Sequence, residues 1–444
     1  MSIQAITTKV ISTLGNKESL IPIMIKDGVD STSLTYKSFK EGGPVEGIDR
    51  AIDEYGTQAI WIGGIPFFKK LIDYTAYKAA KINPKVDPRI IADKEYSLWA
   101  QKNAQGFMPN NPGQKVKTAI NDCLKDGGKL AKNLYKSKIF AATALTLGTF
   151  FLLTKIKQNR TKNTVIDELT AVKKYEQPQA KKSSKNIFDD FNFSSGTPSF
   201  KGLTKKVTDA IMFNPVHNMK IIDAGITTER LAFSRNKTEF FEHAIKEGGF
   251  LFFIYGFGNL IEKGINKVSE KFLQKPVELK IDVLMDKNLQ EALSNGKISK
   301  DIVLFPEKGK SLTEKLNFLL NNPDNIIVQA AKKSKIIQTV KNEAGQNVID
   351  TSKFIDIKEI EQLISDLKNI DDKFKLSKEP VKKFLTKTKG LKVMSVMANI
   401  GISCFVLGYI IPKLIYKYRE MKTGTTKFHV AEDIKNSKKG TINT

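Results

Sequence analysis

Residues 393–412 read VMSVMANIGISCFVLGYIIP, twenty positions without a charged side chain. An α-helix rises about 1.5 Å per residue, so twenty residues are about 30 Å long, which matches the hydrocarbon core of a bilayer. Lysines flank the stretch on both sides, as is common where a helix leaves a membrane. These flanking residues are Lys389, Lys392, Lys413 and Lys417. The stretch therefore predicts a membrane-spanning helix.

Three further apolar segments stand out. Residues 139–154 read IFAATALTLGTFFLLT, while 59–68 (AIWIGGIPFF) and 250–261 (FLFFIYGFGNLI) are too short to span a bilayer unaided. We predict a second membrane helix at 139–154, with a buried core helix as the alternative. For the two shorter segments we predict interfacial or re-entrant positions, against a buried helix or a true span. The lysines that flank 139–154 are Lys136, Lys138, Lys155 and Lys157.

The two short segments contain glycines that either break a helix or let two helices approach closely. Asn399, the one amide in the 393–412 stretch, is able to hydrogen-bond across to a partner helix. These residues are our helix-packing candidates: Gly63, Gly64, Gly256, Gly258 and Asn399.

The chain resembles itself. Without gaps, 45–73 aligns with 238–266, and 138–153 aligns with 392–407. Identical pairs include Glu46 with Glu239 and Glu54 with Glu247. Because the matched segments follow the same order, we predict an internal duplication.

The duplication sets the predicted organisation: a first half at 1–157, a flexible linker at 158–202, a second half at 203–417 and a basic polar tail at 418–444. Each half contains a polar insert, 74–137 in the first and 267–391 in the second. The longer insert is predicted to be helical. Its residues 355–370 place apolar side chains on one stripe, and Ser311 with Glu314 forms a capping-box pattern. Residues 277–285 (VELKIDVLM) alternate like a short strand, and polar turns are expected around 28–36.

We therefore predict a mainly α integral membrane protein with two repeated halves. With two crossings, at 139–154 and 393–412, the halves have opposite topology. With four crossings, including 59–68 and 250–261, they are parallel. For the two-crossing arrangement, each side has ten Lys and Arg residues near the membrane ends, so the positive-inside rule does not choose an orientation.

Composition bears on the partners. The formal net charge is +25, and Arg supplies only six of the 72 cationic residues. Lysine-rich surfaces suit anionic lipid headgroups, whereas bidentate recognition of nucleic acid prefers Arg. An AT-rich bacterial genome accounts equally well for the lysine excess. We expect a bacterial cytoplasmic membrane location, and we do not expect nucleic acid as a partner.

No motif for chemistry is present. The three histidines have no metal-ligand spacing, and the phosphate-loop pattern fails at 307–311 because Leu304 stands where glycine is required. Glu239, His243 and Glu247 share one helix face, which suits a cation or, as we favour, a solvated acidic face. We assign no catalytic, cofactor-binding or metal-ligating residue.

These observations favour a non-enzymatic membrane protein that acts as an anchored scaffold or interaction protein, with 267–391 as the docking module for a protein partner. A homo-oligomer is a further expected partner. The first alternative is a small oligomeric transport or channel component. The second is a peripheral helical protein that binds anionic lipid or nucleic acid through its lysine excess.

Overall fold

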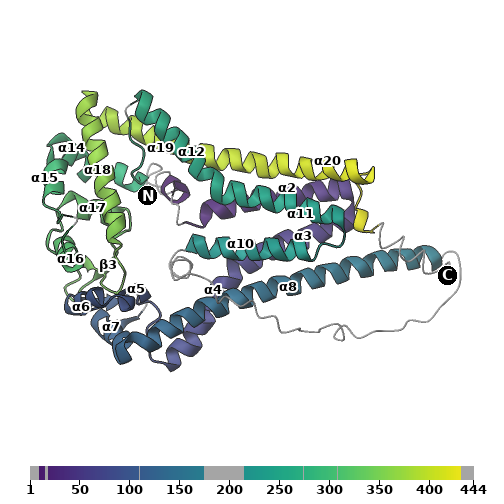
Figure 1. The fold of residues 1–444 in the computed structure, drawn as a ribbon, viewed down its shortest axis with the longest axis horizontal. Coiled ribbons are helices and arrows are strands. Elements are labelled where there is room, and N and C mark those ends of the chain that lie inside the picture. Colours follow the sequence, from purple (N-terminus) through teal and green to yellow (C-terminus); the bar gives the residue numbers. More distant parts are fainter. Residues whose placement is uncertain are drawn as a thin grey trace. The chain divides into compact units, whose positions relative to one another are not determined.

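The computed structural model describes residues 10–15, 19–109, 111–174, 215–273, 275–307 and 309–431. Most of these residues are helical, which confirms the mainly α prediction (Figure 1). The chain forms two compact units, and each unit takes segments from both predicted halves. Unit 1 contains Met1–Met24, Pro66–Ala142 and Ile254–Ser403, and unit 2 contains Ile25–Ile65, Thr143–Phe253 and Cys404–Thr444. The predicted halves are therefore not compact units.

Unit 1 combines short helices with two antiparallel hairpins. In the first insert these are α5 (Pro88–Ala92), α6 (Lys94–Lys102), β1 (Phe107–Met108), β2 (Asn111–Lys115) and α7 (Val116–Leu124). In the second they are α13 (Ile281–Leu284), α14 (Lys287–Ser294), α15 (Lys297–Val303), α16 (Leu312–Asn321), α17 (Ile326–Lys333), β3 (Thr339–Lys341), β4 (Asn347–Ile349) and α18 (Ile357–Ser377).

A single apolar core holds the two inserts together. The first insert contributes buried apolar side chains between Tyr77 and Ala131, and the second contributes buried apolar side chains between Leu279 and Leu385. Tyr96 stacks on Phe354 with ring centroids 4.9 Å apart, and its hydroxyl accepts a hydrogen bond from the Ile355 amide at 2.7 Å. Trp99 Nε1 donates to Asn317 at 2.9 Å. These contacts make the inserts one structural body.

The predictions for the second insert hold in part. The predicted helix at 355–370 is α18, and the capping box of Ser311 and Glu314 starts α16, so both are confirmed. The predicted strand at 277–285 is wrong, because Ile281–Leu284 form the short helix α13. A helical turn lets Ile281, Val283 and Leu284 all face the core, which alternation along a strand does not allow.

Unit 2 is built from long helices. They are α2 (Ile21–Lys37), α3 (Pro44–Ala59), α10 (Pro215–Ala232), α11 (Lys237–Leu251), α20 (Ile411–Thr423) and the second part of α8 (Lys129–Lys174). The polar turns expected around 28–36 are wrong, since these residues lie in α2. The predicted linker is helical over 158–174, where α8 continues, and its remainder lies outside the described residues.

Within the described residues, two helical stretches are long and apolar enough to cross a membrane: Val116–Asp167, which joins α7 and α8 across a kink at Asp126 and Gly127, and Val381–Thr423. The first contains 139–154. The second contains 393–412 and joins α19 (Val381–Phe405), a π-helical turn η7 (Val406–Ile410) and α20. The predicted polar tail begins inside α20, where Arg419 is fully buried, so the residues up to Thr423 are not a tail.

The glycine-containing segments do not break their helices. Residues 59–68 pass from α3 through the π-helical turn η2 (Ile60–Gly64) into α4 (Ile65–Ile72). Residues 250–261 pass from α11 through η5 (Phe252–Gly256) into α12 (Phe257–Val268). A re-entrant segment needs a break that is not seen here, and an interfacial position stays a prediction. The duplication also stays a prediction, although the two aligned segments share this helix–π-turn–helix order.

The shared core of unit 1 makes a first prediction. Replacing Tyr96 with Phe removes the hydroxyl and leaves the buried Ile355 amide without its partner, which costs about 1–3 kcal/mol. We expect this loss in the free energy of unfolding, measured with denaturant. Tyr74→Phe is the control, because Tyr74 is 70% exposed and should change nothing. Equal stability of the Tyr96→Phe variant and the parent chain would contradict the described junction.

A buried charge network as the candidate functional site

Two helices of unit 2 turn their charged faces inward. On α3 the buried charged residues recur at three- and four-residue spacing, and the same holds on α11. This spacing places each set on one helix face. The α3 set is Glu46, Asp49, Arg50, Asp53 and Glu54, and the α11 set is Glu239, Glu242, His243, Lys246 and Glu247. Our interpretation of Glu239, His243 and Glu247 as a solvated face is therefore wrong.

The centre of the network joins four helices. Lys246 on α11 lies 2.8 Å from Glu54 on α3, and Lys157 on α8 lies 3.4 Å from Asp53 on α3. Arg230 on α10 is ion-paired with Glu247 and lies 3.5 Å from Asp53. The same terminal nitrogen of Arg230 that faces Asp53 donates to Thr57 at 3.0 Å.

Arg419 of α20 forms the second part of the network. Its guanidinium makes two hydrogen bonds to the Glu46 carboxylate, at 2.6 and 2.7 Å. It makes two more to Glu242, at 2.7 and 2.8 Å, and one to the Thr426 carbonyl at 3.0 Å. Tyr416 adds a hydroxyl hydrogen bond to Glu46 at 2.9 Å. The planar guanidinium therefore clamps a carboxylate from α3 and another from α11.

A third part lies beside α8. Arg235 pairs with Asp49 at 3.0 Å and also with Glu239, while Thr161 of α8 donates to Asp49. His243 Nε2 lies 3.8 Å from Glu239. The ion pairs thus connect α3 with α8, α10, α11 and α20.

Burial and pairing act against each other in the electrostatics. Burial alone would lower the pKa of Arg235, but the neighbouring carboxylates of Glu239 and Asp49 outweigh it and raise this pKa above its usual range. Burial lowers the pKa of His429, so its neutral form is favoured.

The network is suited to a structural role. The described residues contain no group of three or more His, Cys, Asp or Glu placed to hold a metal ion. Buried ion pairs are costly to desolvate, and their advantage over apolar packing is the specificity of the pairing. We therefore interpret the network as the device that sets which helices of unit 2 lie together.

Two of the helix-packing candidates meet. A side chain on Gly258 would lie 2.7 Å from the Asn399 amide nitrogen, so α12 and α19 approach closely at this point. Gly63 has open space beside it, and Gly256 lies at the end of η5. Gly64 lies at the end of η2 and is half-buried.

The lysines that flank the long apolar helices divide into two groups. Lys138, Lys157 and Lys392 are buried and pair with Asp73, Asp53 and Glu262, so they are turned away from any headgroup. The others are exposed or half-buried: Lys136, Lys155, Lys389, Lys413 and Lys417.

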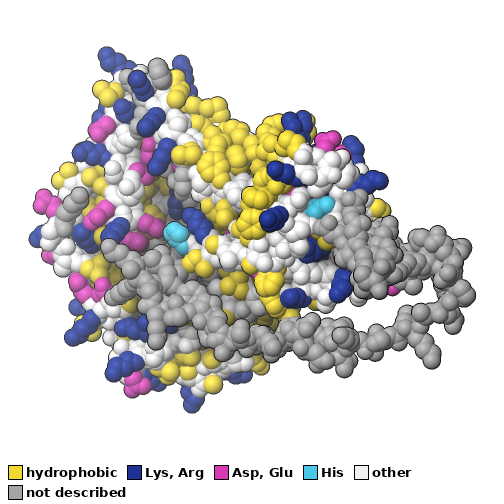
Figure 2. Space-filling model, turned by 45° about the vertical axis from the view of Figure 1, so that its right-hand side comes forward, with side chains coloured by type: hydrophobic (Ala, Val, Ile, Leu, Met, Phe, Trp, Pro, Cys, Tyr) yellow, Lys and Arg dark blue, Asp and Glu magenta, His cyan; other side chains and the backbone are white. Residues whose placement is uncertain are grey.

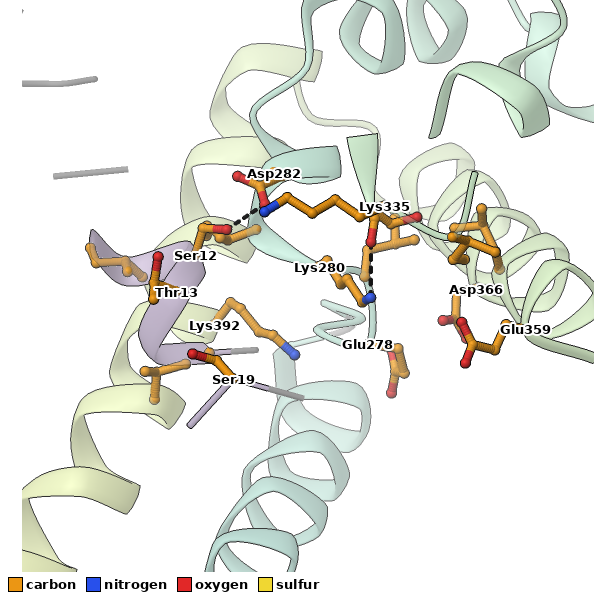
Figure 3. A pocket seen from close by; sticks show the side chains of 18 of the residues that line it. Ser12, Thr13, Ser19, Glu278, Lys280, Asp282, Lys335, Glu359, Asp366 and Lys392 are labelled. Carbon is orange, nitrogen blue, oxygen red and sulfur yellow. Dashed lines mark hydrogen bonds between the residues drawn. The ribbon is translucent and has the colours of Figure 1, made fainter. Parts of the chain in front are cut away.

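A cleft in unit 1 is the second feature of note. Its volume is about 490 Å³. Figure 3 shows Glu359 and Asp366 of α18 on one wall and Lys392 of α19 on another. Lys280 donates to the Ser334 carbonyl at 3.0 Å, and Ser12 donates to Asp282. The lining has more carboxylates than lysines, in a chain whose net charge is strongly positive.

Comparison of the chain with protein-family models, with curated proteins and with solved structures gives no match.

The Arg419 clamp makes a second prediction. Arg419→Met should destabilise unit 2 by about 3–5 kcal/mol, because Glu46 and Glu242 would keep buried charges without their partner. The measurement is thermal unfolding in detergent. Lys422→Met, three residues further along α20 and exposed, is the matched control. A melting temperature of Arg419→Met equal to that of the control would contradict the clamp.

The third prediction concerns acid. Burial keeps His429 neutral in the folded chain below its usual pKa of 6.5, whereas the same side chain takes up a proton in the unfolded chain, so stability should fall below about pH 6.5. The free energy of unfolding measured from pH 8 to 5 tests this. His429→Gln should flatten the pH dependence, and a constant stability from pH 7 to 5 in the parent chain would refute the prediction.

Proposed function

We propose that the chain is a non-enzymatic integral membrane protein that holds unit 1 at a membrane as an interaction module. The observation that carries the proposal is the polarity of α3 and α11 in unit 2, which bury their charges from Glu46 to Glu54 and from Glu239 to Glu247 and expose large apolar side chains. Water favours the opposite arrangement, whereas lipid favours this one.

The exposed apolar residues support a lipid-facing surface. Figure 2 shows hydrophobic side chains gathered in a broad patch on one face. The described side chains more than two-fifths exposed include Phe140, Leu145 and Leu152 on α8. On α19, η7 and α20 they include Met394, Met397, Ile402, Phe405, Tyr409 and Leu414.

The two long apolar helices are also poorly covered by protein. In the most apolar 18 residues of Val116–Asp167 only 28% are buried, and in those of Val381–Thr423 only 22% are buried. A core helix of a water-soluble protein is mostly buried, so these values favour lipid as the surroundings. Exposed patches of this kind otherwise mark aggregation or a partner surface.

Unit 1 supports the interaction role. It has an extensive apolar core of its own, and burial of such a core is what drives folding in water. The second insert contributes most of the lining of its acid-rich cleft, which offers a recessed surface to a basic segment of a protein partner.

One observation favours transport as the second candidate. Lys26 of α2 is 2% exposed, and its ammonium donates at 3.0 Å to the carbonyl of Phe253, which lies in the apolar segment 250–261. Ionisable groups at such depth often belong to ion or substrate paths. A flux assay in liposomes, with Lys26→Met as the comparison, distinguishes this role from anchoring alone.

Extraction tests the proposal, and this is the fourth prediction. The protein should stay with membranes washed in alkaline carbonate, and release into the soluble fraction would refute it. Leu152→Arg should reduce the membrane-inserted fraction, since an arginine in lipid costs about 2.5–3.5 kcal/mol. Leu304→Arg is the matched control, because Leu304 is also exposed but lies in unit 1.

A further inference from the structure

We propose that the four apolar segments cross the bilayer together, so that both polar inserts lie on the same side. This inference rests on the proposed membrane function and replaces the arrangement with two crossings. It follows from contacts within each unit, because groups that touch in one folded core lie on one side of a membrane.

The first step uses unit 1. The inserts 74–137 and 267–391 share one apolar core and several hydrogen bonds, including one from the Asp87 amide to the Ser352 carbonyl at 2.9 Å. The chain between them must therefore cross an even number of times. If 139–154 crosses, one more crossing is needed before residue 267. The remaining long uncharged run in the described part of that stretch is 250–261.

The second step uses unit 2. Asp49, near the start of α3, accepts a hydrogen bond from Thr161 of α8, so the chain between these two residues also crosses an even number of times. If 139–154 crosses, 59–68 must cross as well. Glu242 pairs with Arg419 at 2.7 Å, which couples 250–261 to 393–412 in the same way. The four segments therefore cross together or do not cross.

The third step removes the objection of length. Residues 59–68 and 250–261 are short because charged residues precede them, but these charges are turned inward. Every charged side chain from Pro44 to Phe68 is buried, and so is every charged side chain and His243 from Thr238 to Ile261. Beyond the paired residues Asp49 and Glu242, the outward faces are thus uncharged for 19 helical residues, 50–68 and 243–261, which is about 28 Å of helix and close to the thickness of the hydrocarbon core.

The same reasoning adds α2. Ser12 contacts Asp282 in unit 1, whereas Ser38, directly after α2, accepts a hydrogen bond from Tyr416 in unit 2 at 2.8 Å. α2 therefore crosses too, with Lys26 buried and with apolar residues outward. The exposed residues at the start of α2 are Ile21, Met24 and Ile25.

Cysteine labelling tests the inference and is the fifth prediction. Single cysteines replace the exposed residues Thr118, Ser294, Asn163 and Lys422 in a chain with Cys123→Ser and Cys404→Ala. Sealed vesicles of known orientation are treated with a membrane-impermeant maleimide, before and after detergent. Positions 118 and 294 should react from one side, and positions 163 and 422 from the other.

The outcomes separate the two proposals. Labelling of positions 118 and 294 from opposite sides, with the protein resistant to carbonate, overturns the four crossings and leaves the membrane function. Labelling of all four positions from one side with carbonate resistance also overturns the crossings. Release by carbonate overturns both. If the chain without its native cysteines does not fold, protease is added to sealed vesicles that contain the unaltered chain. Both inserts should then be cut together or protected together, and cutting of one insert alone would overturn the four crossings.

Discussion

The packing of unit 2 depends on the cost of an unpaired charge in a protein interior. Arg419 is fully buried and satisfied by Glu46 and Glu242, and removing any member of this set leaves an uncompensated charge. Apolar side chains tolerate many arrangements, whereas a bidentate guanidinium accepts few. The ion pairs therefore decide which faces of α3, α11 and α20 meet.

The same pairing determines what the outer surface is made of. The charged side chains of α3 and α11 form ion pairs with each other and with residues of α8, α10 and α20. Their outward faces therefore carry aromatic and aliphatic side chains. Tyr55, Phe240 and Phe241 are more than two-fifths exposed on these two helices. A charged interior and an apolar exterior are thus two results of one arrangement.

Local features were predictable from the sequence, and the long-range ones were not. The stripe at 355–370 and the Ser311–Glu314 cap depend on neighbours in the chain, and both are present. Charged faces usually contact water, but the interpretation of Glu239, His243 and Glu247 as a solvated face is wrong because Glu247 is paired with Arg230 on another helix. The alignment of Glu46 with Glu239 and Glu54 with Glu247 was the available signal, since all four are buried.

The shared core of the inserts makes segment-by-segment hydropathy an incomplete guide to the membrane crossings that we propose. Judged alone, 59–68 and 250–261 are too short to span, and 139–154 is marginal. Tyr96 contacts Phe354, and Thr161 contacts Asp49, across long stretches of chain. In a membrane, each of these contacts requires an even number of crossings between the two residues. Under the proposed membrane function, the tertiary contacts therefore mean that 59–68, 139–154 and 250–261 cross the bilayer if 393–412 crosses it. The length and lack of charge of 393–412 favour lipid most strongly.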